Sequence, residues 1–461
     1  MKLRVRGGAP LRGRAALPAD MAVAQRALAV AALCSHATRI AERLPEGDAM
    51  IGVLRALGVT IAHGAEGTHV SGVGLRGLTA PAGALDAGTS ATAFAITTGL
   101  LCAQRFGTRV LLETAGESPA PAIAAALRAR GAMIAEGNLQ APGPGGSKRT
   151  SLAVAPLVDD EALRELERAL AAPNEHVKTA LLFSGLFATG PTTVSEPLLS
   201  ADHTERWLSA AGAPIRRLGS VAGFDPSEHD GALSFSSAPL GADGERVLRL
   251  PGDTTFASLI ALVASVVGGS EVRLENVGWN ATRTGVLDAL RLSGARITAT
   301  SHGDGSGKER SGHEPVAEAR VTPARLRGGP IDGELLVRAG SAAPLLAVIG
   351  ACSARGATLH DAAFYPELQP QPWPRLAAAL GAFGVAAGVL ADQSLRIEPA
   401  AEIVPARFDA LGSPALGLLA LALALLAKGE SLLEGMPVLD EQWPGLVGVL
   451  AQLGARIEVE P

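Results

Sequence analysis

The sequence predicts an α/β protein built from six copies of one structural unit, and three observations lead to that prediction. A stop signal, L-x-x-x-G-[A/V], occurs six times along the 461 residues. Apolar stretches of small residues alternate with short β-branched stretches, a pattern typical of α/β folds. Several of the apolar stretches lack a polar face, so we expect those helices to be buried on all sides. A signal repeated at nearly even spacing indicates one unit used repeatedly.

Each stop signal is predicted to end a helix at its glycine. A helix that ends at a left-handed residue favours glycine there, because other side chains clash at positive φ. The leucine four residues earlier would dock the last turn onto a core. Intervals of 70 to 90 residues separate the six glycines, which are Gly58, Gly131, Gly212, Gly294, Gly384 and Gly454.

Three apolar stretches are predicted to form buried helices. Ala24–Leu33 and Thr255–Val267 consist of small and aliphatic residues nearly all round. The run 414–427 is entirely apolar apart from its glycine. It has 14 residues, whereas a bilayer-spanning helix needs about 20. We therefore expect this run to be a buried helix of the core.

Short β-branched stretches are interpreted as the strands of the six units. They are Thr38–Ile40, Thr108–Val110, Thr192–Val194, Glu271–Leu274, Ala357–Leu359 and Ser431–Leu433. Further strands are expected directly after two stops, at Ala295–Thr298 and Ala455–Val459. The Pro- and Gly-rich stretch Ala141–Ser147 and the polar stretch Ser301–Glu314 are expected to be surface loops or hairpin tips.

The six units are expected to form two domains. Strands must surround the buried helices, so three units around one bundle of helices make a domain. Two similar segments with the pattern L-P-x-D, Leu17–Asp20 and Leu250–Asp253, open the first and fourth units. We interpret them as crossings between the domains. Domain I then comprises residues 1–17 and 250–461, and domain II comprises residues 18–249.

Composition excludes several classes of protein. Apolar residues make up 48% and charged residues 18% of the chain, which argues against disorder. The net charge of −5 gives no support to nucleic-acid binding. The three cysteines are far apart without C-x-x-C spacing, as expected for buried thiols in a reducing compartment. No apolar signal segment follows Met1. We expect a cytoplasmic monomer that binds neither nucleic acid nor membrane.

Four motifs, in order and correctly spaced, give the chain a family resemblance. The longest, Leu274–Gly285, has the sequence L-E-N-V-G-W-N-A-T-R-T-G. The others are Asp202–Arg206 (D-H-T-E-R), Leu85–Gly88 (L-D-A-G) and Val177–Leu182 (V-K-T-A-L-L). Over nearly its whole length the chain resembles the 5-enolpyruvylshikimate-3-phosphate synthase (3-phosphoshikimate 1-carboxyvinyltransferase) family of enolpyruvyl transferases.

The resemblance implies both a fold and a reaction. The implied fold is a two-domain inside-out α/β barrel of six βαβαββ units, three in each domain. The implied reaction joins phosphoenolpyruvate to the 5-hydroxyl of shikimate 3-phosphate and releases phosphate, a step of aromatic amino acid biosynthesis. Small-molecule substrates would lie in the interdomain cleft, with no cofactor and no metal. Such anionic substrates need Lys and Arg ligands, and the proton transfers need carboxylates.

The sequence departs from the family pattern where those ligands should be. In the first crossing the family's P-G-D-K-S-x-S-H-R becomes Pro18–Arg26, in which Met21 replaces the lysine and only the arginine remains. Two further family arginines align with Ala95 and Ser118, and a late lysine falls near Glu441.

The remaining family site positions are also replaced. The S-[S/A]-Q triplet aligns with Asn174, Glu175 and His176, and the D-E-x-P segment with Ser341–Pro344. Of the family's R-V-K-E-S-D-R, only the last arginine remains, as Arg375. The family's H-R-I-A-M segment has no counterpart.

The surviving polar residues are the candidates for a site. The resemblance makes His176 and Glu175 the candidate catalytic pair, because a His–Glu pair can perform acid–base chemistry. The candidate substrate-binding residues are Arg26, Arg375, Thr89, Thr92, Asn174, Lys178 and Ser341. Each has a structural alternative: the arginines as structural residues on helices, His176 as a polar residue without chemistry, and Thr89 or Thr92 as a helix N-cap. Asp20, Asp253 and the D-H pair at Asp202 are expected to be structural.

The departures leave three functional hypotheses open. A hydrogen bond to a charged group contributes about 1.5–3 kcal/mol, so five lost cations would cost on the order of 7–15 kcal/mol. A micromolar ligand binds with only about 8 kcal/mol. The chain is therefore the nominal transferase with a degraded site, an enzyme of the same fold acting on a less charged substrate, or a non-catalytic relative that binds a ligand or partner.

Overall fold

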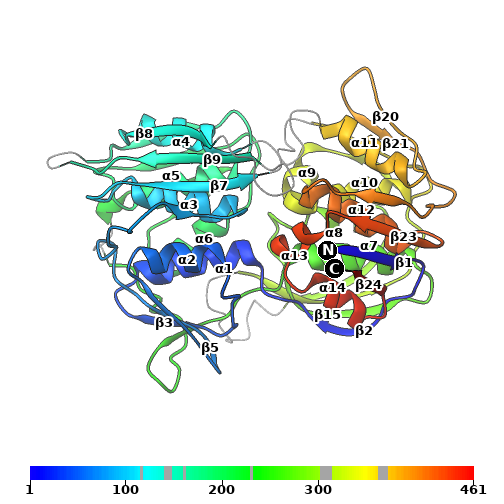
Figure 1. The fold of residues 1–461 in the computed structure, drawn as a ribbon, viewed down its shortest axis with the longest axis horizontal. Coiled ribbons are helices and arrows are strands. Elements are labelled where there is room, and N and C mark those ends of the chain that lie inside the picture. The colour runs from blue at the N-terminus through cyan, green and yellow to red at the C-terminus, as the bar shows by residue number, and fades with distance from the viewer. Residues whose placement is uncertain are drawn as a thin grey trace.

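The computed structural model describes residues 1–114, 118–139, 148–158, 162–228, 232–301, 314–361 and 372–460. The chain forms two lobes that lie side by side (Figure 1). Lobe I has a hydrophobic core drawn from residues 3–17 and 256–455. Lobe II has a separate core drawn from residues 23–250. Both termini lie in lobe I, because the first strand pairs with strands near the end of the chain.

Within the described residues the strands form six four-stranded sheets of one recurring design. Each sheet has one parallel pair at one edge and two antiparallel pairs. The predicted alternation of helices and strands is confirmed, and each of the six expected β-branched stretches lies in a strand.

The sheets of lobe II have the orders β14-β3-β5-β4, β6-β7-β9-β8 and β10-β11-β13-β12. Their strands are β3 (Ala37–Ile40), β4 (Thr60–Gly64), β5 (Gly67–Ser71), β6 (Leu85–Asp86), β7 (Thr108–Thr114), β8 (Ile134–Leu139), β9 (Lys148–Val154), β10 (Leu166–Ala169), β11 (Thr192–Ser195), β12 (Arg216–Leu218), β13 (Val221–Phe224) and β14 (Arg246–Leu248).

The sheets of lobe I have the orders β16-β17-β15-β2, β18-β19-β21-β20 and β22-β23-β1-β24. Their strands are β1 (Lys2–Arg6), β2 (Arg12–Ala16), β15 (Glu271–Gly278), β16 (Arg296–Ser301), β17 (Val316–Thr322), β18 (Gly329–Ile331), β19 (Ala357–Leu359), β20 (Ala387–Val389), β21 (Leu395–Ile397), β22 (Arg407–Asp409), β23 (Glu430–Glu434) and β24 (Arg456–Glu460).

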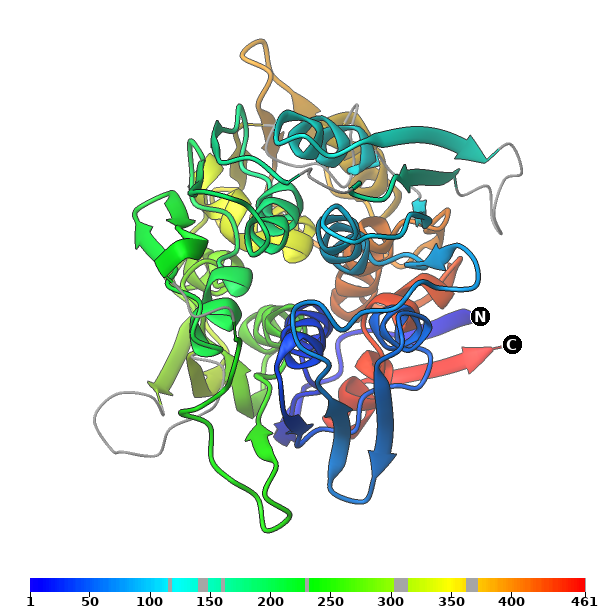
Figure 2. The ribbon, with the colours of Figure 1, turned by 90° about the vertical axis from the view of Figure 1, so that its left-hand side faces the viewer.

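Three inner helices fill the middle of each lobe. In lobe II they are α1 (Met21–Leu33), α3 (Ala91–Leu101) and α5 (Glu175–Gly185), and in lobe I they are α7 (Thr254–Val266), α10 (Pro344–Ala351) and α12 (Pro414–Leu426). Nearly every residue of these helices is buried. Figure 2 views lobe II end-on, with its inner helices near the middle and strands toward the outside. The three predicted buried helices are thereby confirmed.

The other helices lie beside the inner ones. They are α2 (Ala49–Ala56), α4 (Ala120–Ala129), α6 (His203–Ala210), α8 (Gly285–Leu292), α9 (Gly333–Ala339), α11 (Pro372–Ala382), α13 (Pro437–Gln442) and α14 (Leu446–Gln452). Among the described residues, no single helix combines the length and apolar composition needed to cross a bilayer. Segments 333–342 and 344–351 meet that test only when taken together, and they are bent by 109°.

All six stop signals end a helix in the same hydrogen-bonded motif, which confirms their interpretation. Each glycine has φ between +76° and +101°. At the first stop, Gly58 N–H donates to Arg55 O at 3.0 Å and Val59 N–H donates to Leu54 O at 3.0 Å. This pair of bonds satisfies the last carbonyl groups of the helix. The same two bonds recur at the other five stops, and each stop leucine is fully buried.

The two L-P-x-D segments lie against each other where the chain passes between the lobes. Asp20 N–H donates to Pro251 O and Asp253 N–H donates to Pro18 O, both at 2.9 Å. Each aspartate also caps an inner helix: Asp20 accepts from Val23 N–H at 3.1 Å, and Asp253 accepts from Thr255 N–H at 2.6 Å. The crossing segments thus join the first turns of α1 and α7, and both aspartates cap the inner helices that they precede.

The loops expected at 141–147 and 301–314 lie outside the described residues, apart from Ser301 and Glu314. The same is true of 369–371, which lie just before α11.

Gly99 permits the close approach of α3 to α5, and its replacement gives a first testable prediction. A Cβ added at Gly99 would lie 2.6 Å from the backbone oxygen of Ala180. We expect Gly99→Ala to lower the free energy of unfolding by about 1–3 kcal/mol, because overpacking forces the backbone apart. Urea unfolding followed by circular dichroism measures the change.

The control for this prediction is the same substitution at Gly52, an exposed residue of α2 with nothing within 4 Å of an added Cβ. There alanine should raise the free energy of unfolding by about 0.5–1 kcal/mol through its better helix propensity. Equal effects of the two substitutions would contradict the prediction.

Candidate functional site

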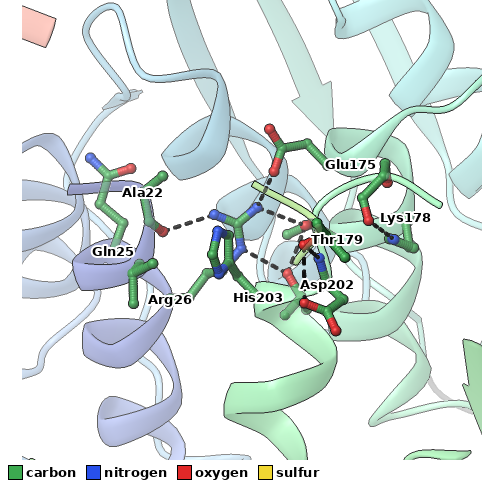
Figure 3. A network of polar contacts seen from close by, with 12 residues as sticks. Ala22, Gln25, Arg26, Glu175, Lys178, Thr179, Asp202 and His203 are labelled. Atoms are coloured by element: carbon green, nitrogen blue, oxygen red, sulfur yellow. Dashed lines mark hydrogen bonds and ion pairs between the residues drawn. The ribbon is translucent and has the colours of Figure 1, made fainter. Parts of the chain in front are cut away.

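Arg26 lies at the centre of a buried polar network in lobe II (Figure 3). Its side chain is fully buried on α1. The guanidinium donates to Thr204 Oγ1 at 2.9 Å, to Ala22 O at 2.8 Å and to Glu175 Oε2 at 3.1 Å. A buried cation is tolerated when it is paired with an anion and hydrogen-bonded. Arg26 is therefore neutralised by the protein itself, through the carboxylate of Glu175.

Glu175 begins α5 and turns its carboxylate toward Arg26, as Figure 3 shows. Asn174 caps this helix by accepting from Val177 N–H at 3.0 Å. Burial raises the pKa of Glu175, but the positive charges of Arg26 and Arg283 lower it more, so that it falls to about 2. Glu175 therefore stays ionised at neutral pH and is a weak proton acceptor.

His176 follows Glu175 but is not hydrogen-bonded to it. Burial lowers the pKa of His176, and the charges of Arg26 and Arg283 lower it further against the opposing effect of Glu175. The imidazole is therefore neutral at pH 7. Its Nδ1 is buried and has no hydrogen-bond partner within the described part of the chain. The expected His–Glu pair is thus an ionised carboxylate paired with arginine beside a neutral imidazole.

Lys178 points into the interior of lobe II. Its Nζ lies 2.9 Å from Glu196 Oε2 and 3.0 Å from Glu205 Oε1, and it donates to Ser200 O at 3.3 Å. The side chains of all three charged residues are at most 2% exposed. The structure therefore places Lys178 in a buried ion-pair triad, where its charge is matched by two glutamates.

The N-cap of α3 is Ser90, which corrects the expectation that Thr89 or Thr92 caps this helix. Ser90 Oγ accepts from Ala93 N–H at 3.0 Å and donates to Gln25 Oε1 at 2.7 Å. Thr89 is exposed and Thr92 is buried. The three residues are equally suited to capping by type, so the cap depends on which of them lies at the turn into the helix.

Lobe I contributes Ser341, Thr255 and Arg283 to the region between the crossings. Ser341 Oγ lies 3.3 Å from Thr255 Oγ1 and accepts from Arg283 at 3.3 Å. The Arg283 side chain lies against Gly340, which has a positive φ and where an added Cβ would meet the guanidinium. Arg283 also lowers the pKa values of Glu175 and His176, so its charge acts from lobe I on two groups of lobe II.

Arg283 is the cation of this region that the candidate residues omitted, although it lies within the long motif Leu274–Gly285. The other arginine of this neighbourhood, Arg338, is paired with Asp288 and donates to Thr284 Oγ1 at 3.1 Å. Arg375 lies half-buried on α11. Among the described residues, no hydrogen bond or ion pair joins Arg375, Thr89 or Thr92 to the Arg26 network.

Asp253 is one of the two aspartates of the crossing segments. Burial and the neighbouring charge of Asp20 raise its pKa to about 7, against the hydrogen bonds of the α7 cap and the charge of Arg283. A carboxyl group with this pKa exchanges protons near neutral pH.

Two of the four motifs, Leu274–Gly285 and Asp202–Arg206, meet each other across the lobes. Asp202 and His203 precede and begin α6 in lobe II, whereas Asn280, Thr282 and Glu314 belong to lobe I. Asn280 Nδ2 donates to Asp202 Oδ1 at 2.7 Å and to Glu314 Oε2 at 3.2 Å. His203 Nδ1 lies 2.8 Å from Glu314 Oε1. The D-H pair was expected to be structural; its partner in the other motif was not predicted.

Comparison with known proteins identifies the family. The family model for EPSP synthase (3-phosphoshikimate 1-carboxyvinyltransferase) matches residues 5–450. The chain is 37% identical over 369 residues to the 3-phosphoshikimate 1-carboxyvinyltransferase of Alkalilimnicola ehrlichii, covering 78% of this chain and 74% of that protein. It is 33% identical over 457 residues to that of Synechococcus sp. strain RCC307, covering 97% and 98%.

Solved structures show the same fold. EPSP synthase from Acinetobacter baumannii superposes with a TM-score of 0.78 at 24% identity, covering 100% of both chains. The enolpyruvyl transferase NikO from Streptomyces tendae superposes with a TM-score of 0.67 at 18% identity, covering 99% of this chain and 98% of that one. With its mixed α/β fold and these relatives, the chain belongs to the EPSP synthase (3-phosphoshikimate 1-carboxyvinyltransferase) family.

Proposed function

We propose that this chain is an enolpyruvyl transferase-family protein that binds a small molecule carrying fewer negative charges than shikimate 3-phosphate and phosphoenolpyruvate. It would not turn over that standard pair at ordinary rates. One observation carries the proposal: Arg26, the arginine retained from the family's first motif, is fully buried and paired with the chain's own Glu175 at 3.1 Å.

The internal ion pair matters because Glu175 competes with any ligand anion for Arg26. Charge-assisted hydrogen bonds hold phosphate and carboxylate groups, and each contributes about 1.5–3 kcal/mol. Here the carboxylate of Glu175 already occupies the guanidinium. Because Met21, Ala95 and Ser118 carry no charge, they supply no replacement cation. These replacements remove less binding free energy from a ligand with one charge, or with none, than from the phosphorylated substrates shikimate 3-phosphate and phosphoenolpyruvate.

The chemistry available to such a ligand differs from the family pattern. Ser341 and the alanines after it stand where the family has an Asp and a Glu. Asp253, with its pKa of about 7, is the group that could exchange a proton near neutral pH, and His176 offers a neutral imidazole. We propose the region between Arg283, Ser341 and His176 as the ligand site, with no metal or cofactor.

The nominal 3-phosphoshikimate 1-carboxyvinyltransferase activity is the second candidate, and Arg283 is the observation that favours it. Among the described residues, the guanidinium of Arg283 donates a hydrogen bond only to the neutral Ser341 side chain. Its charge acts on Glu175, His176 and Asp253. An anion could therefore bind Arg283 without displacing a carboxylate of the protein.

The two-lobed arrangement is proposed to work as the family's two-domain clamp. Domain I would comprise residues 1–17 and 250–461, and domain II residues 18–249, each an inside-out α/β barrel of three βαβαββ units. The six similar sheets, the two separate cores and the three inner helices of each lobe support this arrangement.

Calorimetric titration with shikimate and with shikimate 3-phosphate tests the proposal, because the two probes differ by one phosphate. We expect shikimate 3-phosphate to bind no more tightly than shikimate, and we expect no phosphate release when phosphoenolpyruvate is added. Tenfold tighter binding of the phosphorylated probe, together with phosphate release, would establish the nominal activity instead. Binding of neither probe would favour the non-catalytic alternative.

A further inference from the structure

We propose that His203 and Glu314 form a proton-dependent clasp between the lobes, fastened when His203 is protonated, which holds the two lobes at a fixed angle. The clasp consists of Asp202, His203, Asn280, Thr282 and Glu314. The inference concerns the orientation of the lobes and does not depend on which ligand binds between them.

The clasp residues bridge the lobes with direct contacts. Asp202 and His203 come from lobe II at the start of α6. The other three come from lobe I: Asn280 and Thr282 from the turn after β15, and Glu314 from two residues ahead of β17. Besides the bonds of Asn280, Thr282 Oγ1 donates to Asp202 Oδ1 at 3.3 Å and accepts from Asp202 N–H at 3.3 Å. A change in the angle between the lobes at this point must break several of these bonds.

The clasp is dry. All five of its residues are at most 6% exposed. Charges in such surroundings are screened little by salt and water, and an unpaired charge there is costly. The protonation state of one ionisable group therefore affects the stability of the whole clasp.

His203 supplies the counter-charge that Glu314 needs. Asp202 is already paired with Arg206 at 2.7 Å and with Arg217 at 2.8 Å, both within lobe II. Glu314 forms its ion pair with His203, and this is the only ion pair between the lobes among the described residues. His203 Nε2 is buried without a partner in the described structure, so the bond to Glu314 is the hydrogen bond that the ring makes.

The surroundings favour the protonated ring. Burial lowers the pKa of His203, but the charge and hydrogen bond of Glu314 raise it more, so that it lies above its ordinary value. From α1, Arg26 lowers it and Asp20 raises it. The other charged groups facing this region are Glu175 on α5, and Asp202, Glu205 and Arg206 at α6.

The sign of the pH effect follows from this raised pKa. Because the pKa is higher in the fastened state than in a free histidine, the clasp contributes fully below about pH 6.5. Its contribution is lost as the pH rises through the raised pKa. Deprotonation leaves Glu314 buried beside a neutral ring, which weakens the contact between the lobes.

Small-angle X-ray scattering of the whole chain between pH 6 and pH 9 tests the clasp. We expect the radius of gyration to step upward as His203 loses its proton. In His203→Gln and Glu314→Gln the radius of gyration should have the larger value over the whole pH range, without the step. A wild-type radius that stays constant over this range, with His203 titrating within it, would overturn the proposal.

His69→Gln is the matched control, because His69 Nδ1 and Glu245 Oε2 form a similar pair at 2.7 Å that lies within lobe II. This variant should keep the wild-type step; loss of the step here would overturn the proposal. If the clasp variants do not fold, a measurement on the wild-type protein still tests the proposal. Nuclear magnetic resonance titration must then give His203 a pKa above 6.5, and a lower value would refute the clasp.

Discussion

Replacing Lys178 with methionine is expected to lower the free energy of unfolding by about 3–5 kcal/mol, the range for removing one partner of a buried ion pair. Lys178 is the counter-ion of both Glu196 and Glu205, at 2.9 and 3.0 Å. Methionine has a similar volume, so packing is largely kept while the two carboxylates lose their cation. Burial already raises the pKa of Glu205, against the lowering effect of Lys178, so the variant should take up a proton when it folds. Urea unfolding followed by circular dichroism measures the loss.

Two further variants make the Lys178 prediction specific. Lys428→Met removes a lysine whose side chain is 73% exposed and whose ion pair with Glu402 spans 3.5 Å. Because an exposed pair contributes about 0–1 kcal/mol, this control should change stability little. Adding Glu205→Gln to Lys178→Met should recover part of the loss, because one uncompensated charge is removed. The prediction fails if Lys178→Met is no more destabilising than Lys428→Met.

The parts of the fold that could be predicted are those that local sequence determines. A glycine at positive φ and a leucine one turn earlier specify a helix end without reference to the rest of the chain, and all six such ends are present. Helices with no polar face had to be interior, and α1, α7 and α12 are. Each of these patterns lies within a single helix and its end, which is why one sequence was enough to find them.

The site could not be predicted in the same way, because its contacts join residues far apart in sequence. Arg26 and Glu175 are separated by 149 positions and His203 and Glu314 by 111. The family resemblance marked Arg26 as a substrate ligand and Glu175 as a replacement in the substrate triplet. The resemblance could not show that the carboxylate of Glu175 neutralises the guanidinium of Arg26. Likewise the D-H-T-E-R and N-A-T-R-T-G motifs were found separately, and only the fold shows that they meet.

Replacing Glu175 with alanine is expected to raise the affinity of the protein for inorganic phosphate and phosphoenolpyruvate by about 10- to 100-fold, the equivalent of one hydrogen bond to a charged group. Glu175 is 25% exposed, whereas Arg26 behind it is fully buried. Removing the carboxylate therefore opens a path from solvent to an unpaired guanidinium. Acidification to pH 5 should not have this effect on the wild-type protein, because the pKa of Glu175 is about 2. Calorimetric titration at constant ionic strength measures both affinities.

Glu167→Ala is the control for this gain, because Glu167 is an exposed glutamate on β10 of the same lobe. It should leave anion affinity unchanged. The double variant Glu175→Ala, Arg26→Met should lose the gain if Arg26 is the group that binds the anion. A gain that survives without Arg26 would instead assign anion binding to Arg283, and no gain at all would mean that Glu175 is not what keeps anions from Arg26. A gain that depends on Arg26 would show that one side chain of the protein takes the position of a substrate anion, so that this relative keeps the family's arginine while excluding its charged ligands.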